Sequence, residues 1–579
     1  MKGLFKRGAK PLRDVLPPLL SIIVPAFDVE KFLGECLDSL QTQSLRDIEI
    51  IVIDDGSPDK IAAITKRHAK SDPRVRLIRQ ANQGVSAARN AGIEASRGRY
   101  LTFVDPDDIV LTDGFRDAVQ SLEASGADWA VLPYRQFDRA GNRDIPPWVA
   151  EIFAQGLRTV KPGEVPAITV HTNVAAKVYR REFWDRAGMG FRPDVRFEDQ
   201  EVAARAYAYA DTIDIVPTES YLWRLRGGSF TREASETTMR YFFDAIRNSF
   251  EHLDRIPGAV TARAGQLLAN DVPRYLRALV KVDDAGYASE LFDGIEFLWP
   301  LVDREIWRRD TPAEGKILEW LVCNGRRSDV AAFVAADGFT LANHPFELLP
   351  EGPALRFPCF DDATVPREAF VLSERQTPAD ARALRVVLNE SGVDLEIMAY
   401  LRHLDTGQPS ARAWLVADGV DAAELELTHV DTFVGHRLRT TRASNERSIW
   451  RTGFDWPSVP ESAASVELMV RVEVTHLGRT ESTVLALIDP AGSAAWPQRA
   501  GRWQWAGAEP ARWFTGDAID TVAPAIESPV SVLDLPLDSP EGWWGFDGDK
   551  NVVWTELPAA EREHAAFWWQ RDFGLNGQS

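Results

Sequence analysis

The stretch RYLTFVDPDD, residues 99–108, decides how the first part of this chain folds. Its apolar run at 101–104 predicts a buried strand, because the run is continuous and partly β-branched. The strand leads directly into Asp105, Asp107 and Asp108, and the proline between them ends the ladder. Carboxylates this close together repel one another, and hard divalent cations prefer such oxygen ligands. A solvated acidic turn is the simpler interpretation of the motif alone. The neighbouring motifs must therefore decide between such a turn and a cation site.

Strand and helix patterns alternate before this stretch. Buried apolar runs predict strands at 19–25, 48–53 and 75–78, and helical spacing predicts helices at 31–43, 61–69 and 85–95. Such alternation implies right-handed crossovers and a mostly parallel α/β sheet. Ligands of these sheets bind at the carboxyl ends of the strands. We therefore expect the segments 25–28, 54–57 and 105–108 to lie close together.

Four motifs, in this order and spacing, resemble the family 2 glycosyltransferases. They are SIIVPAFDVE (21–30), IDDGS (53–57), NQGVSAARN (82–90) and FVDPDD (103–108). The resemblance covers roughly residues 20–230 and implies a GT-A fold, which is a Rossmann-like, mostly parallel sheet. It also implies a nucleotide-sugar donor, usually a UDP-sugar, and a divalent cation, Mn²⁺ or Mg²⁺.

The resemblance assigns the first two motifs to the nucleotide. It implies that Asp55 accepts a hydrogen bond from the uracil ring, near the backbone of Pro25 and Phe27. By position, Asn82 belongs to the same donor site. The family often has Tyr-Asn where this chain has Phe27 and Asp28, so the added charge leaves the role of Asp28 open.

The fourth motif is assigned to the metal. The resemblance implies that Asp105 lies beside the ribose and the metal and that Asp107 ligates the metal, which bridges the donor diphosphate. It places Arg89 against the diphosphate or the Asp105 cluster, with a structural ion pair as the alternative. A bound cation also fits the chemistry, because a leaving diphosphate develops negative charge.

Two later motifs complete the expected site. FEDQE (197–201) resembles the segment that carries the general base of inverting members, which implies Asp199 as the base. The neighbouring Glu198, or simple capping of a helix by acidic residues, is the alternative. The segment 221–230 resembles the part that folds over the diphosphate. Where some members have a metal-binding histidine it has Arg224 and Arg226, and one guanidinium there would neutralise phosphate charge.

The second half of the chain changes character. A basic tail at 1–19 and the catalytic domain at 20–230 are followed by a helical pattern at 231–345 and by alternating strands at 346–579. The alternation predicts an antiparallel β-sandwich. Its many tryptophans suit sugar stacking if exposed, although burial between sheets is the simpler expectation. This layout resembles the glycosyltransferases of teichoic-acid-like cell-surface polymers, which append β-modules to the catalytic domain.

Composition restricts the remaining possibilities. The chain has 579 residues and a formal net charge of −20, which argues against general nucleic-acid binding. Its three cysteines have no metal-ligand spacing, and no apolar run is long enough to span a bilayer. We expect a cytoplasmic protein, with the basic tail offering a weak contact to the anionic inner face of the plasma membrane.

The leading hypothesis is an inverting, metal-dependent glycosyltransferase. Its expected acceptor is a bacterial cell-surface glycopolymer or its lipid-linked precursor, and its C-terminal region would bind acceptor or mediate oligomerisation. An inactive carbohydrate-binding or scaffolding protein is the alternative, although the joint presence of Asp55, Asp105, Asp107 and Asp199 favours the enzyme. A nucleotidyltransferase is disfavoured because no Gly-rich basic motif follows the first strand.

Overall fold

The chain consists of two compact units, residues 1–306 and 307–579. The computed structural model describes residues 17–137, 143–193, 195–225, 234–282, 284–388, 392–404, 408–417, 420–430, 448–455, 467–487, 504–505, 513–514, 542–546 and 552–556. Most of the predicted basic tail at 1–19 lies outside these residues. The predicted helical region at 231–345 is divided between the two units, and the division falls inside α12 (Arg304–Asp310).

An eight-stranded sheet forms the core of the first unit, in the order β3-β2-β1-β4-β10-β6-β11-β9. The strands are β1 (Leu20–Ala26), β2 (Ile48–Asp54), β3 (Val75–Arg79), β4 (Tyr100–Phe103), β6 (Trp129–Val131), β9 (Arg158–Val160), β10 (Lys177–Arg180) and β11 (Ile213–Ile215). The first four are mutually parallel, as are β6 and β11. Only β9 and β10 run antiparallel to their neighbours. The predicted mostly parallel α/β sheet is therefore confirmed.

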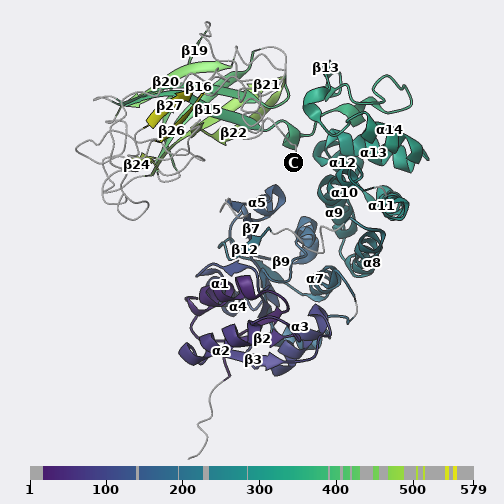
Figure 1. The fold of residues 1–579 in the computed structure, drawn as a ribbon, viewed down its shortest axis with the longest axis vertical. Helices are drawn as coiled ribbons and strands as arrows, with labels where there is room; N and C mark the ends of the chain where they lie inside the picture. Colours follow the sequence, from purple (N-terminus) through teal and green to yellow (C-terminus); the bar gives the residue numbers. More distant parts are fainter. Residues whose placement is uncertain are drawn as a thin grey trace, which may run out of the picture. The chain divides into compact units, whose positions relative to one another are not determined.

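Helices cover both faces of this sheet. The helices of this part of the chain are α1 (Glu30–Gln41), α2 (Ile61–Ser71), α3 (Val85–Ala95), α4 (Gly114–Ser125), α5 (Pro147–Phe153), α6 (Arg181–Arg186) and α7 (Glu198–Tyr209). In Figure 1, α1 and α2 lie on one side of β2 and β3, and α3 lies on the other. This placement follows from right-handed crossovers in a sheet whose strand order reverses at β1. The reversal puts the ends of β1 and β4 side by side, where a ligand site is expected.

The proline expected to end the first strand lies inside it. β1 pairs with β2 through Pro25 and Ala26, opposite Ile53 and Asp54. On its other side, the pairing of β1 with β4 ends at Ile23. Pro25 therefore lies where β1 has only one neighbouring strand, and its missing N–H leaves no ladder bond unmade.

A second, smaller sheet and a helical annex complete the first unit. The sheet has the order β5-β12-β7-β8, formed by β5 (Ile109–Val110), β12 (Tyr221–Arg224), β7 (Tyr134–Phe137) and β8 (Arg143–Asp144). The annex contains α8 (Glu236–Leu253), α9 (Ala259–Gln266), a π-helical turn (Leu267–Asp271), α10 (Val272–Ala278) and α11 (Ala285–Leu298). Pro273 follows the π turn, and because proline cannot donate to the preceding turn of an α-helix, a wider turn there is expected.

The second unit begins with helices whose core contains charged side chains. Its helices α13 (Ala313–Cys323) and α14 (Arg327–Ala335) precede the hairpin β13 (Phe346–Leu349) and β14 (Gly352–Leu355). Glu314 and Lys316 of α13 are fully buried. Gln376 Nε2 donates to Glu314 Oε2 at 2.8 Å, and Lys316 Nζ donates to Val371 O at 2.6 Å. These bonds tie α13 to the segment that leads into the β region.

Antiparallel sheets dominate the rest of the second unit. One sheet has the order β19-β20-β16-β15-β23, the other β18-β17-β21-β25-β24 with β22 beside β21, and β26 pairs with β27. Their bounds are β15 (Ala379–Leu388), β16 (Gly392–Leu401), β17 (Ser410–Ala417), β18 (Val420–Leu425), β19 (Thr428–His429), β20 (Ile449–Asp455), β21 (Glu467–His476), β22 (Arg479–Val484), β23 (Ala486–Leu487), β24 (Gln504–Trp505), β25 (Trp513–Phe514), β26 (Gly542–Phe546) and β27 (Val552–Glu556). All pairs among these described strands except β15 with β23 are antiparallel, which confirms the predicted sandwich class.

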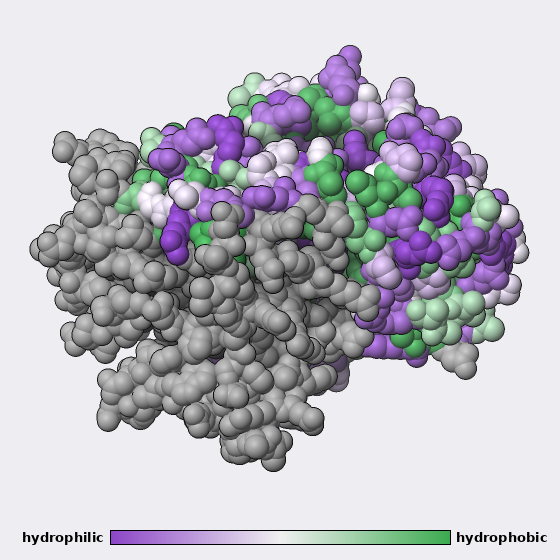
Figure 2. Space-filling model, turned by 90° about the horizontal axis from the view of Figure 1, so that it is seen from above, coloured by the Kyte–Doolittle hydropathy of each residue, from purple (hydrophilic) through white to green (hydrophobic). Residues whose placement is uncertain are grey.

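In the Trp-rich β region, the side chains of two tryptophans can be placed. Trp450 is buried, and Trp414 lies between charges, with the guanidinium carbons of Arg471 and Arg412 at 4.0 and 4.8 Å from its ring centroid. Both rings are thus occupied by protein contacts. The side chains of the other tryptophans after residue 450 lie outside the described residues. Within the part of the chain that the structure describes, no helix combines the length and apolarity needed to cross a bilayer. On the face drawn in Figure 2, hydrophilic residues surround small hydrophobic patches.

Candidate active site

The ends of β1, β2 and β4 meet, as the sequence predicts. Asp55 N–H donates to Ala26 O at 3.0 Å, and Val104 N–H donates to Ile23 O at 3.0 Å. Each loop after a strand is therefore bonded to the end of β1. The three segments that follow these strands form one edge of the sheet.

Asp55 holds the loop between β3 and α3. Its Oδ1 accepts from Gln80 Nε2 at 2.8 Å and from Gln83 N–H at 2.9 Å, and its Oδ2 accepts from Gly84 N–H at 2.8 Å. Gly56 is needed where the two loops touch, because a Cβ there would lie 2.7 Å from Asn82 N. Asn82 itself is exposed at this edge. Asp55, which the sequence assigned to the uracil, thus also organises the loop that carries Asn82.

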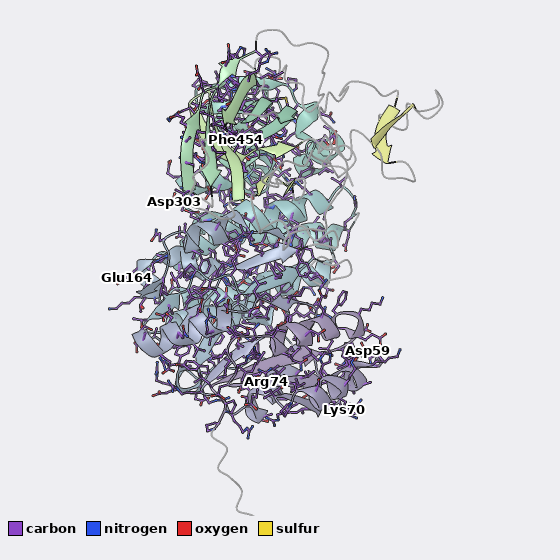
Figure 3. All side chains as sticks on the ribbon, turned by 90° about the vertical axis from the view of Figure 1, so that its left-hand side faces the viewer. Asp59, Lys70, Arg74, Glu164, Asp303 and Phe454 are labelled. Atoms are coloured by element: carbon purple, nitrogen blue, oxygen red, sulfur yellow. The ribbon has the colours of Figure 1, made fainter. Side chains whose placement is uncertain are left out.

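The segment after β1 forms the rim of the same edge. Pro25 is buried, whereas the Phe27 side chain is 45% exposed and open to a ligand. Asp28 adopts a left-handed backbone with φ 51°, and its N–H donates to Ser57 Oγ at 2.9 Å. The Ser57 hydroxyl in turn donates to Asp59 Oδ1 at 2.6 Å; Asp59 is labelled in Figure 3. Asp28 therefore bridges the two loops through its backbone, a role that its side-chain charge did not indicate.

Arg89 joins the acidic motif to the helix that carries Asp199. The Arg89 side chain is only 5% exposed, its Nη2 donates to Asp105 Oδ1 at 2.9 Å, and its Nη1 donates to Glu198 Oε1. The carboxylates of Glu198 and Asp105 raise the pKa of Arg89 against the effect of its burial, so it stays charged. The structure thus places Arg89 in ion pairs with Asp105 and Glu198, which fit both the expected position in the Asp105 cluster and the structural alternative.

Asp108 and Tyr221 organise the motif, and neither was assigned a role from the sequence. The Tyr221 hydroxyl donates to Asp108 Oδ2 at 2.7 Å and accepts from Asp105 N–H at 3.1 Å. Arg224 N–H donates to Asp108 Oδ1 at 2.8 Å. Burial and the neighbouring carboxylates of Asp105 and Asp107 raise the pKa of Asp108 well above its usual range. The only indication in the sequence was the additional aspartate that directly follows Asp107.

Arg224 packs against the metal motif. Its Nε donates to Asp107 O at 2.7 Å and its Nη2 to Glu35 Oε2 at 2.6 Å, while its guanidinium lies 4.4 Å from the Phe137 ring centroid. Arg224 therefore fixes the backbone at Asp107, and a role at the diphosphate stays a prediction. Arg226 lies outside the described residues.

Glu198 and Asp199 differ in whether another side chain already binds their carboxylates. Glu198 is engaged by Arg89, whereas the Asp199 carboxylate accepts no hydrogen bond within the described part of the chain. Burial and the adjacent Glu198 carboxylate raise the pKa of Asp199 to about 7, which suits a group that exchanges protons near neutral pH. Phe197, the N-cap of α7, has the left-handed φ of 56°. Strain of this kind is often retained where it positions a functional group.

Two carboxylates fit a divalent cation. Among the described residues, no group of three His, Cys, Asp or Glu side chains has the arrangement of a metal site. Mg²⁺, however, is commonly held by one or two carboxylates together with substrate phosphates. Asp105 and Asp107 meet that requirement, with the Asp105 side chain 36% exposed.

Comparison with known proteins gives the family. A profile of Glycosyl transferase family 2 matches residues 21–185. The chain is 36% identical over 222 residues to the uncharacterized glycosyltransferase EpsJ of Bacillus subtilis, covering 37% of this chain and 63% of EpsJ. It is 31% identical over 227 residues to the glycosyltransferase GlyG of Streptococcus pneumoniae, covering 37% of this chain and 73% of GlyG. The chain belongs to glycosyl transferase family 2.

Further similarities extend the comparison. The succinoglycan biosynthesis protein ExoO of Rhizobium meliloti is 27% identical over 295 residues, covering 46% of this chain and 80% of ExoO. The crystal structure of S. aureus TarS aligns over 94% of this chain and 97% of TarS, with a TM-score of 0.46 and 14% identity. The glycosyltransferase predicted from the sequence is thus confirmed at the level of the family. The matched part spans 63% of EpsJ, so the activity of the whole chain is a separate question.

Proposed function

We propose that this chain transfers a sugar from a nucleotide-sugar donor, with UDP-sugar as the first candidate, to an acceptor hydroxyl with inversion at the anomeric carbon. The observation that carries the proposal is the open Asp199 carboxylate beside the ion-paired Arg89, Asp105 and Glu198 cluster. An acceptor hydroxyl is a poor nucleophile at neutral pH, and a carboxylate that removes its proton accelerates the attack.

The donor would lie along the edge formed by β1, β2 and β4. Phe27 is exposed there for contact with the nucleobase, and Asp55 has an accepting position left on Oδ2. Asp105 and Asp107 would hold Mn²⁺ or Mg²⁺, which when bound stabilises the negative charge on a leaving diphosphate. Asp199 would take the proton of the acceptor hydroxyl, because Glu198 is held by Arg89.

We infer an acceptor among bacterial surface glycopolymers or their lipid-linked precursors. The likeness to ExoO, a protein of succinoglycan biosynthesis, supports a polymer acceptor. The β region belongs to the second unit, whereas the residues of the candidate site named above belong to the first. Binding of the polymer or assembly of the enzyme is the role we propose for it.

The test is release of nucleotide from a panel of UDP-, GDP- and dTDP-sugars in the presence of Mn²⁺. We expect release from one donor class, loss of release in EDTA, and loss in Asp107→Ala with the fold retained. Asp199→Asn should bind the donor normally and lower the transfer rate roughly a hundredfold. Absence of release from every donor would support the inactive, carbohydrate-binding alternative. Undiminished activity in EDTA would refute the metal, and normal activity of Asp199→Asn would refute the base.

A further inference from the structure

The helical annex packs against the turn that carries Asp199. The Phe197 ring packs edge-to-face on Phe242 of α8, with ring centroids 5.4 Å apart. α7 and α8 lie side by side in Figure 1, with α9 next to them. Residues more than 40 positions further along the chain therefore contact the start of the helix that presents the base.

Arg263 of α9 makes the second contact. Its side chain is 3% exposed, its Nη2 donates to Gln200 Oε1 at 2.9 Å, and its Nη1 donates to Gln266 Oε1. Gln200 directly follows Asp199, and its Nε2 donates to Thr172 Oγ1 at 3.4 Å. The Gln200 side chain thus bridges α7 and the segment before β10, and Arg263 fixes one side of this bridge.

The charge of Arg263 is balanced indirectly. A guanidinium removed from water costs several kcal/mol unless charges compensate it. Among the described residues no carboxylate forms an ion pair with Arg263, and its hydrogen-bond partners are neutral amides. The negative groups that act on it through space are Asp271 and Asp199. The Arg263 cation and the Asp199 carboxylate therefore attract each other through space.

We propose that Arg263 is a positioning residue for the reaction: it holds the first turn of α7 through Gln200 and keeps the Asp199 carboxylate ionised. This inference rests on the proposed role of Asp199 as the base. It assigns part of the catalytic machinery to the annex, outside the 21–185 region that defines the family.

Several charged groups act on Asp199, and the test must separate them. Glu198 on the same helix and Asp105 after β4 raise its pKa, whereas Arg89 of α3 and Arg263 of α9 lower it. Lys177 of β10 is also buried nearby and interacts with Asp199. Loss of the Arg263 charge should move the pKa of Asp199 upward, because a nearby cation that favours the carboxylate is removed.

The experiment compares Arg263→Gln, Arg263→Lys and the control Arg205→Gln. Arg205 lies on α7, the helix that carries Asp199, and its Nη2 donates to Gly188 O at 2.7 Å near the surface. The readout is the pH dependence of nucleotide release at saturating donor, with UDP and Mn²⁺ binding measured by calorimetry. We expect Arg263→Gln to be about tenfold slower at pH 6.5 and within twofold of the parent at pH 9, with unchanged UDP affinity. Arg205→Gln should match the parent throughout.

Arg263→Lys separates charge from geometry and covers the case in which Arg263→Gln does not fold. It should keep the pH profile of the parent but turn over several-fold more slowly at every pH, because an ammonium group cannot reproduce the fork to both amides. Wild-type rates in Arg263→Lys, or an unshifted pH profile in Arg263→Gln, would overturn the inference. The proposed function would stand in that case, provided that Asp199→Asn is inactive. A fully active Asp199→Asn would instead refute the base itself.

Discussion

Replacement of Asp199 by asparagine should make the protein more stable at pH 8 while it lowers the transfer rate roughly a hundredfold. The folded-state pKa of Asp199 is raised to about 7 by burial and by Glu198, and an unfolded aspartate titrates near 4. A raised pKa means that ionisation opposes folding. The penalty is absent below about pH 4, grows as the pH rises, and is complete above about pH 7. Asparagine has the same shape and carries no charge, so it removes the penalty.

The magnitude follows from the difference between the two pKa values. Three units correspond to an upper limit of ~4 kcal/mol in the free energy of unfolding. The Asp199 side chain is partly exposed, which weakens the effect through solvent screening, so we expect a gain of about 2 kcal/mol at pH 8 and near zero at pH 4.5.

Urea unfolding of the wild type and of Asp199→Asn at pH 4.5 and pH 8 measures this gain. Glu198→Gln is the matched control, because it removes a neighbouring carboxylate that pairs with buried Arg89. Its loss should destabilise the protein at pH 8 by about 1–3 kcal/mol, opposite in sign to Asp199→Asn. A destabilised Asp199→Asn at pH 8, or an equal gain at both pH values, would refute the electrostatic reasoning.

Three further predictions concern the pH profile of the reaction, the acidic motif and the first helices of the second unit. The rate of nucleotide release should fall on the acid side with an apparent pKa of about 7, and a rate independent of pH between 5.5 and 8 would contradict the role of Asp199. Tyr221→Phe removes the hydroxyl between Asp108 and the Asp105 N–H and should cost about 1–3 kcal/mol of unfolding free energy in urea; an unchanged midpoint would show that this hydroxyl does not stabilise the motif. A 1–340 fragment lacks the partners that Glu314 and Lys316 find beyond residue 370, so limited proteolysis should cut α13 faster than in the full chain, and equal rates would contradict this.

Local patterns predicted the sheet well. Continuous apolar runs such as 48–53 identify strands in a buried parallel sheet, and the order of elements fixes which strand ends meet. The same patterns placed Asp55 and Asp105 at one edge, and the resemblance to the family added Arg89. They failed at Pro25, because whether a proline ends a strand depends on where the neighbouring strand stops.

Contacts across long separations could not be predicted. Gln200 and Arg263 are 63 residues apart, and nothing in a helical pattern shows that one of its arginines is buried against another helix. Likewise, the sequence favoured Asp199 as the base and left its neighbour Glu198 as the alternative. The ion pair of Glu198 with Arg89, 109 residues away in the chain, distinguishes them.

The bonds of Asp55 bear on which donors such a site tolerates. A carboxylate offers about four accepting positions, and three of those on Asp55 are taken by the chain's own Gln80, Gln83 and Gly84. The loop is therefore already in place before any nucleotide arrives, so little ordering entropy is lost on binding. A single remaining position gives only a small energy difference between one base and another. Exchange of the nucleobase in the donor would thus be limited mainly by ring size and stacking, which leaves donor preference open to change by few substitutions around Phe27.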